Sequence, residues 1–205
     1  MNSCRFQRAR SPEQKAARRA QILDAAAAFF ASQRFEAISL ADIARQAGVT
    51  KAALYRYFPS KEALFLALYL SALEQVSAAE LTADVGLADS LTELLVSQPL
   101  FCRLTAIVHT VLEQNLDSEQ AKAFKTALLE RFSRLAERLQ AQFGLTQPQS
   151  VRYLFQVQQS LIGCWAMSHP SRAVADVIDV PPLSIFRLDF RNALQLQLQA
   201  LAAAL

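Results

Sequence analysis

The chain has 205 residues and a formal net charge of +3, with 53% hydrophobic and 19% charged residues. This length provides a core for one large domain or two small ones, and the composition argues against an intrinsically disordered chain. Glycine occurs only four times, while helix formers such as Ala, Leu and Gln are abundant, so an all-helical fold is expected.

The sequence pattern also argues against a membrane span and a secretory leader. It holds no run of about 18 uninterrupted apolar residues. The arginines near the N-terminus have no apolar segment directly behind them, so no secretory signal is expected. Three widely spaced cysteines fit neither a disulfide framework nor a zinc site, and neither a metal nor a cofactor is expected. The expected location is therefore a reducing cytoplasm.

The charge is distributed unevenly along the chain. Residues 1–60 hold ten Lys and Arg against four acids, which gives +6, whereas residues 61–205 hold eleven against fourteen, which gives −3. A basic first third on a mildly acidic remainder indicates contact with a polyanion. A solvated charged face is the alternative that charge alone leaves open.

Residues 1–12 are predicted to form a disordered basic tail. Helical periodicity begins at Glu13 and is carried by apolar residues between Ile22 and Phe30. This first helix is expected to end near Ser32–Arg34.

Two short helices are predicted next. Ser39 has the character of an N-cap, with Asp42 three residues on in a capping-box-like arrangement. Gly48 stands where the end of a helix favours a positive φ. Thr50 then caps a third helix, which runs to about Tyr57.

Pro59 is expected to stop the third helix, and Ser60 to cap a fourth one that reaches about Leu81. Residues 13–60 thus form a first domain and residues 61–205 a second. Within the second domain, helical segments are predicted at about 89–97, 100–114, 118–143, 149–167 and 183–204.

The turn "AGVT" between the second and third helices predicts a helix-turn-helix. Gly48 permits the sharp turn and Val49 lies under it, while Leu54 and Phe58, four apart, point back to the core. The opposite side of the third helix is then free to enter a DNA major groove, with small residues for close approach and donors for phosphates. The N-terminus of the fourth helix, at Ser60, can bind a further phosphate through backbone N–H groups.

The stretch "AGVTKAALYRYFPSKEALF" resembles the DNA-binding domain of the tetracycline-repressor (TetR) family, and the resemblance extends over about residues 16–76. Tyr57 stands where many members have histidine, and Arg34 replaces the usual glycine before Phe35. The resemblance implies a homodimeric transcriptional regulator, most often a repressor, with a helical C-terminal domain that dimerises and binds a small-molecule effector. The resemblance also implies which positions contact DNA: Ser39, Thr50, Lys51, Ala52, Ala53, Tyr55, Arg56, Tyr57 and Lys61.

Some of these positions keep a second interpretation. Ser39 can serve only as a cap, and Tyr57 can serve only in packing. The arginines at positions 5, 8 and 10 can form a minor-groove arm or an ordinary basic tail.

No motif identifies an effector, but two apolar helices in the second domain offer candidate pocket residues: Phe101, Cys102, Thr105, His109, Phe155, Gln159 and Trp165. Each also has a structural interpretation, such as a core or surface histidine for His109 and a core or interface aromatic for Trp165. Cys102 and Cys164 can be buried structural residues or thiol sensors.

A two-fold homodimer is predicted through segments 149–167 and 183–204, whose apolar stripe includes Leu194 and Leu198. A charge at either leucine is expected to dissociate it. The predicted function is a DNA-binding repressor released from a palindromic operator by a small molecule. The alternative is a DNA-organising protein that needs no effector. No catalytic triad, metal motif or phosphate loop suggests an enzyme.

Overall fold

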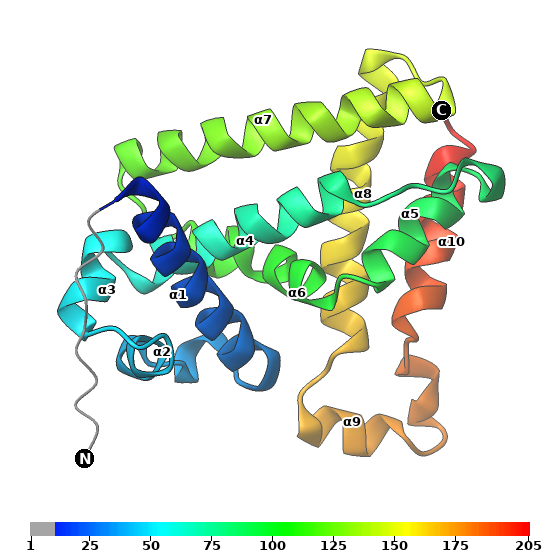
Figure 1. Cartoon of the computed structure of the whole chain (residues 1–205). Coiled ribbons are helices and arrows are strands. Elements are labelled where there is room, and N and C mark those ends of the chain that lie inside the picture. The colour runs from blue at the N-terminus through cyan, green and yellow to red at the C-terminus, as the bar shows by residue number, and fades with distance from the viewer. Residues whose placement is uncertain (1–10) are drawn as a thin grey trace. The chain divides into compact units, whose positions relative to one another are not determined.

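The computed structural model describes residues 11–205, in which helices are the regular elements and no β-strand occurs (Figure 1). The predicted all-α fold class is confirmed. The chain divides into two compact units, one up to Tyr69 and one from Leu70. This division falls inside the helix α4, Lys61–Ala78, rather than at its start. The predicted tail lies outside the described residues, except for Ser11 and Pro12, which begin the first helix.

The first unit contains three complete helices, one 3-10 turn and the first half of α4. Their bounds are α1 Pro12–Ser32, η1 Phe35–Ala37, α2 Leu40–Gln46 and α3 Lys51–Tyr57. The ring of Phe65 meets Phe30 at 5.3 Å and Phe35 at 5.0 Å between centroids, both edge to face. This aromatic cluster ties α1 and η1 to α4.

The second unit contains the rest of α4 and the remaining helices. Their bounds are η2 Ala83–Val85, α5 Leu87–Val96, α6 Pro99–Ile107, η3 Val108–Leu112, α7 Ser118–Phe143, α8 Gln147–Ser168, α9 Arg172–Ile178, η4 Leu183–Phe186 and α10 Phe190–Ala202. The predicted helix at 183–204 is therefore two elements, and α9 was not predicted.

The helix α7 holds the last turns of α4 through its arginines. Glu74 accepts from Arg134 at 2.6 Å and forms an ion pair with Arg131 at 3.1 Å. Arg138 donates to the carbonyls of Ser77 and, at 2.7 Å, of Ala79. Because the last carbonyls of a helix lack partners within it, Arg138 supplies hydrogen bonds that the end of α4 would otherwise take from water.

The helix α10 lies against α5 and α8. Leu194 and Leu198 are 0% exposed within the single chain. The prediction that charges at these two leucines would act on a dimer interface is therefore wrong, because both side chains belong to the protomer's own core. A polar contact also joins α5 to α10. The Asp89 carboxylate of α5 accepts hydrogen bonds from Gln195 at 2.9 Å and Gln199 at 3.0 Å, and these hydrogen bonds lower the pKa of Asp89.

Among residues 11–205, no single helix is long and apolar enough to cross a membrane. The pair Leu87–Val96 and Pro99–Leu112 reaches that length and composition only when taken together, and it is bent by 91°.

Candidate nucleic-acid interface

The turn between α2 and α3 is built as the sequence predicts. Gly48 has a φ of 63°, which an L-residue with a Cβ adopts at a cost. The N–H of Val49 donates to the Ala44 carbonyl at 2.9 Å, and the Val49 side chain is buried. The chain therefore reverses within four residues and places the start of α3 beside the end of α2.

The start and the inner face of α3 are both fixed. The Thr50 hydroxyl accepts from the Ala53 N–H at 3.1 Å and caps the helix. Leu54 is 0% exposed and Phe58 3% exposed. Because these two side chains are buried in the first unit, the opposite face of the seven-residue helix must lie in solvent.

The outer face of α3 carries the predicted DNA-contacting groups. Lys51, Ala52 and Arg56 are exposed, and Tyr55 is 43% exposed. The ammonium of Lys51 lies 5.9 Å from the centroid of the Tyr55 ring, so these two donors sit next to each other. Ala53 and Tyr57 are half-buried at the edges of this face. The structure thus groups six of the nine predicted residues on one short helix.

Ser39 is the N-cap of α2. Its hydroxyl accepts from the Ala41 N–H at 3.1 Å. The expected capping box does not form, because the Asp42 carboxylate pairs with Arg45 at 2.5 Å instead of returning to the cap. The hydroxyl of Ser39 is exposed and retains its donor hydrogen, so the cap leaves it able to bind a phosphate.

Lys61 differs from the other predicted donors because it is engaged within its own unit. Its ammonium donates to the Glu36 carbonyl at 3.3 Å and lies 4.3 Å from the centroid of the Phe35 ring. Burial lowers its pKa, with opposing effects from Glu36 and Glu62. Ser60, next to it, caps α4 by accepting from the Ala63 N–H at 3.0 Å.

Arg45 is a cationic group that the sequence reasoning left out. Its side chain is 81% exposed in the last turn of α2, directly before the turn. An exposed ion pair such as the one with Asp42 is weak and exchanges readily for another anion. The sequence feature that could have identified Arg45 as a candidate DNA contact is its position three residues before Gly48, on the helix that precedes α3.

The candidate pocket residues of the second unit fall in two kinds of environment. Phe101, Cys102 and Thr105 are buried, and Thr105 donates to the Phe101 carbonyl at 2.8 Å. Phe155 and Gln159 are exposed on α8. Their role in binding an effector stays a prediction.

The remaining two candidates make their own local contacts. The ring of His109 lies 3.1 Å from the Gln158 amide and 3.2 Å from the Glu113 carboxylate. Trp165 stacks on His169 with centroids 3.8 Å apart and meets Phe190 edge to face.

Within residues 11–205, the two cysteine thiols, Cys102 and Cys164, are both buried. The Cys102 thiol donates to the Leu95 carbonyl at 3.1 Å, and burial raises its pKa to about 12. Burial also raises the pKa of Cys164. Because only the thiolate is reactive, these environments favour the structural interpretation over a thiol sensor.

The helix α3 follows a sharp turn, is anchored by buried apolar side chains and exposes cationic side chains on its other face. This arrangement defines a helix-turn-helix DNA-binding protein. A family model described as "Bacterial regulatory proteins, tetR family" matches residues 22–68, and one described as "Tetracyclin repressor-like, C-terminal domain" matches residues 65–203. The chain belongs to the tetracycline-repressor family of DNA-binding transcriptional regulators.

Curated relatives include nucleoid occlusion factors named SlmA. The one from Alteromonas mediterranea is 33% identical over 138 residues, which cover 62% of this chain and 65% of that protein. The one from Marinobacter nauticus is 46% identical over 63 residues, 31% of this chain and 32% of that protein. The match thus spans less than two thirds of either relative's length.

Solved structures show the same fold. NalD from Pseudomonas aeruginosa, the secondary repressor of the MexAB-OprM multidrug efflux pump, matches with a TM-score of 0.51 at 23% identity, over 92% of this chain and 96% of that one. The fatty acid degradation regulator FadR from Bacillus halodurans matches with a TM-score of 0.53 at 18% identity, over 91% and 98%.

Proposed function

We propose that the protein is a homodimeric repressor whose two α3 helices read successive major grooves of a palindromic operator. The observation that carries this proposal is the two-sided α3, with Leu54 buried and Lys51, Tyr55 and Arg56 exposed. Two such helices reach successive grooves when they lie about 34–36 Å apart. A regulator of this kind acts where the chromosome is, so a cytoplasmic location is part of the proposal.

Thr50 and the predicted contact residues of α3 each have a role that their chemistry allows. Lys51, Tyr55 and Thr50 donate to phosphates and fix the position of the helix on the duplex. Ala52 and Ala53 are small enough to let the backbone approach the base edges. Arg56 reaches either a phosphate or the O6 and N7 acceptors of guanine, and it is the candidate for sequence discrimination.

The proposed homodimer uses the outward faces of α8 and α10. Phe155 and Met167 on α8 are 54% and 65% exposed, and Leu196 on α10 is 68% exposed. Leu194 and Leu198 fill the protomer core on the inner side of α10, so the apolar residues left outside form a separate surface. Exposed large apolar side chains on these two helices favour a partner surface over water.

A small-molecule effector completes the proposal. A ligand that prefers a conformer with a different separation of the two α3 helices lowers operator affinity by its differential binding, typically about 1–3 kcal/mol. Family membership supports this step, and the second unit is where an effector would bind.

A second candidate function is DNA organisation without an effector. The observation that favours it is the similarity to proteins named nucleoid occlusion factors, which extends beyond the DNA-binding unit in the 138-residue match. Both candidates use the same α3 surface, so they differ in where on the chromosome the protein binds and in whether a ligand releases it.

Sequencing of genomic fragments selected by the purified protein tests both candidates. A few palindromic sites in front of genes support the repressor, whereas many sites dispersed over the chromosome without regard to genes support the organiser. Binding to the selected sites must weaken steeply as salt rises, because phosphate contacts release counterions. Affinity that is flat with salt, or no selected site at all, contradicts the proposed interface.

A further inference from the structure

The connection between α8 and α10 is a short helical arm, defined here as residues 171–187, which contains α9 and η4. Neither element contains a buried residue. Figure 1 shows the arm in orange, beyond the ends of α8 and α10. The two elements pack on each other. The arm is therefore an ordered piece of backbone that contributes no buried side chain to its own protomer.

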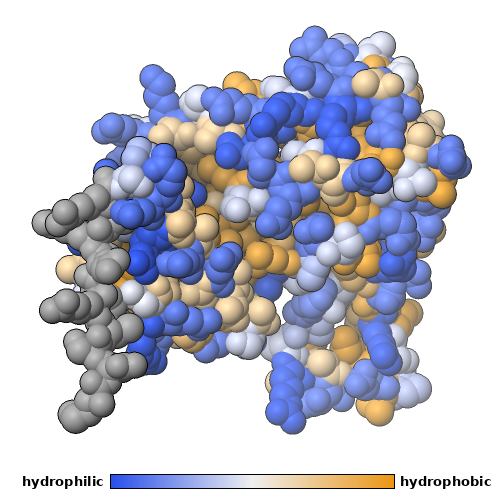
Figure 2. Space-filling model, viewed as in Figure 1, coloured by the Kyte–Doolittle hydropathy of each residue, from blue (hydrophilic) through white to orange (hydrophobic). Residues whose placement is uncertain are grey.

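Apolar side chains are concentrated on this arm. Of the twelve exposed large apolar residues that the structure describes, six belong to it. Ile185 is 82% exposed and Phe186 is 67% exposed, and Figure 2 shows apolar surface on the arm among polar neighbours. The six residues are Val174, Val177, Val180, Leu183, Ile185 and Phe186. Apolar surface gathered in this way marks an interaction site rather than ordinary exposure.

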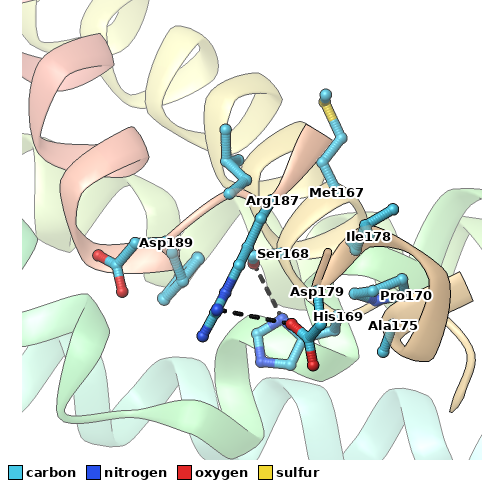
Figure 3. A pocket seen from close by; sticks show the side chains of 11 residues that line it. Met167, Ser168, His169, Pro170, Ala175, Ile178, Asp179, Arg187 and Asp189 are labelled. Carbon is cyan, nitrogen blue, oxygen red and sulfur yellow. Dashed lines mark hydrogen bonds and ion pairs between the residues drawn. The ribbon is translucent and has the colours of Figure 1, made fainter. Parts of the chain in front are cut away.

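A cleft of about 600 Å³ lies beside the arm (Figure 3). It opens between the end of α8, α9 and the start of α10. Met167, Ile178, Leu188 and Phe190 provide apolar lining, and Ile185 and Phe186 are outside it. The cleft also contains an exposed ion pair at 3.5 Å between Arg187 and Asp179. The lining also includes Ser168, His169 and Asp189, so the recess is partly apolar and partly polar. One short segment thus presents an apolar projection and, next to it, a recess with an apolar part.

We propose that in the homodimer Ile185 and Phe186 of one copy enter this cleft on the second copy, and that the second copy does the same in return. A projection and a recess on one element can satisfy each other across a two-fold axis, where each contact occurs twice. The inference rests on the homodimer of the proposed function. It adds a contact outside the faces of α8 and α10.

Continuity and area support a second copy as the occupant. The arm follows the last turn of α8, where Met167 is 65% exposed, so one partner can cover Met167 together with the arm. A stable interface buries about 800 Å² per partner, and six large apolar side chains supply on the order of a few hundred Å² of it. Reciprocal insertion of the arms therefore accounts for a substantial part of the dimer interface.

The charge of the arm argues against other occupants. Arg172 and Arg187 are balanced by Asp176 and Asp179, so the arm has no net charge. Nucleic acid requires a cationic surface, and a helix that lies on an anionic membrane carries an excess of Lys and Arg on its polar face. A surface that is neutral and apolar suits a second copy of itself.

Photo-crosslinking in the full-length protein tests the contact directly. Phe186 is replaced by benzoylphenylalanine, and Val85, 49% exposed on η2, is replaced in the same way as the control. Irradiation should give a covalent dimer from position 186 only, with the crosslink in the partner's residues 167–190. A crosslink from position 186 to any other part of the partner overturns the assignment to the cleft.

Sedimentation equilibrium measures how much the arm contributes to the stability of the dimer. The double variant Ile185→Asp with Phe186→Asp should raise the dimer Kd at least tenfold, while Val85→Asp leaves it unchanged. Circular dichroism and urea unfolding of the variants at monomeric concentrations check that each protomer is folded, which is expected because all three side chains are exposed. Ala175→Trp, which fills the cleft from its own wall, should weaken the dimer without touching Ile185 or Phe186.

The outcomes separate this inference from the homodimer on which it rests. Wild-type protein that is monomeric at every concentration overturns both. Wild-type protein that dimerises with the same Kd as the double variant overturns the arm contact alone. Binding of the wild type, but not of the double variant, to vesicles of anionic phospholipid would assign the arm to a membrane surface and overturn the proposal.

Discussion

The phenol of Tyr153 on α8 donates a hydrogen bond of 3.1 Å to the backbone carbonyl of Leu198 on α10. Both residues are fully buried, and burial raises the pKa of the phenol. This bond crosses between the last two long helices at the place where Leu194 and Leu198 fill the core, so it helps to fix how α10 lies on α8.

Tyr153→Phe removes the donor and keeps the ring. The net loss of such a hydrogen bond is about 1 kcal/mol, and it reaches about 3 kcal/mol if the carbonyl is left without a partner. Urea unfolding should therefore show a lower midpoint with an unchanged slope. Tyr55→Phe, which changes an exposed tyrosine in the same way, should leave the midpoint where it is; equal midpoints for all three proteins would contradict the role assigned to this bond.

Lys51→Ala should weaken binding to the selected operator while leaving thermal stability nearly unchanged, because the side chain is exposed. Loss of one phosphate contact reduces the slope of log K against log salt by about 1. Lys122→Ala, at an exposed lysine of α7, is the matched control and should leave both affinity and slope alone. Tyr55→Phe should also weaken binding at fixed salt. An operator affinity that Lys51→Ala leaves intact would remove Lys51 from the interface.

Gly48→Ala should destabilise the first unit by about 1–2 kcal/mol, the cost of holding an L-residue in the left-handed region. A Cβ there meets nothing within 4 Å, so backbone strain is the whole effect. Gly163 also has open space around it but lies within α8 without a positive φ, and Gly163→Ala is expected to stabilise by about 0.5–1 kcal/mol. Chemical denaturation of both variants measures the change in the free energy of unfolding, which should be negative for Gly48→Ala and positive for Gly163→Ala. Changes in the same direction would show that the φ of Gly48 is not the cause.

The thiol of Cys102 makes stability depend on alkaline pH. Its ordinary pKa of 9.0 is raised by burial to about 12, so the unfolded chain ionises first. The stability linked to this thiol is fully present below about pH 9 and is lost as pH rises from 9 toward 12. The free energy of unfolding should fall over this window, and more slowly in Cys102→Ser, which has no group titrating there. Parallel curves for the two proteins would rule out the thiol as the source.

The helix-turn-helix could be predicted because its determinants are local. Ser39, Gly48 and Thr50 each act on backbone within a few residues. The four-residue spacing of Leu54 and Phe58 alone predicts which face of the third helix is buried. The fold class followed from the same periodicity repeated along the chain. The Lys61 ammonium could not be placed, because its acceptor on Glu36 lies 25 residues earlier.

The second unit was predicted less well, since its pairings are long-range. The apolar stripe with Leu194 and Leu198 was assigned to a dimer, whereas α5, about a hundred residues earlier, covers that side of α10 and holds Gln195 through Asp89. The arm helix α9 was missed because it has seven residues between proline-containing stretches and buries none of them. Periodicity reveals an apolar side, but not which neighbour covers it.

The helix α3 has only seven residues, too few to be stable alone in water, so its conformation depends on Leu54, Phe58 and the Thr50 cap. Of the residues that would face a duplex, Lys51, Ala52, Tyr55 and Arg56 take no part in that support. Positions 51, 52, 55 and 56 can therefore be randomised together with little penalty to folding, and the same scaffold could be retargeted to new DNA sequences by screening such a library.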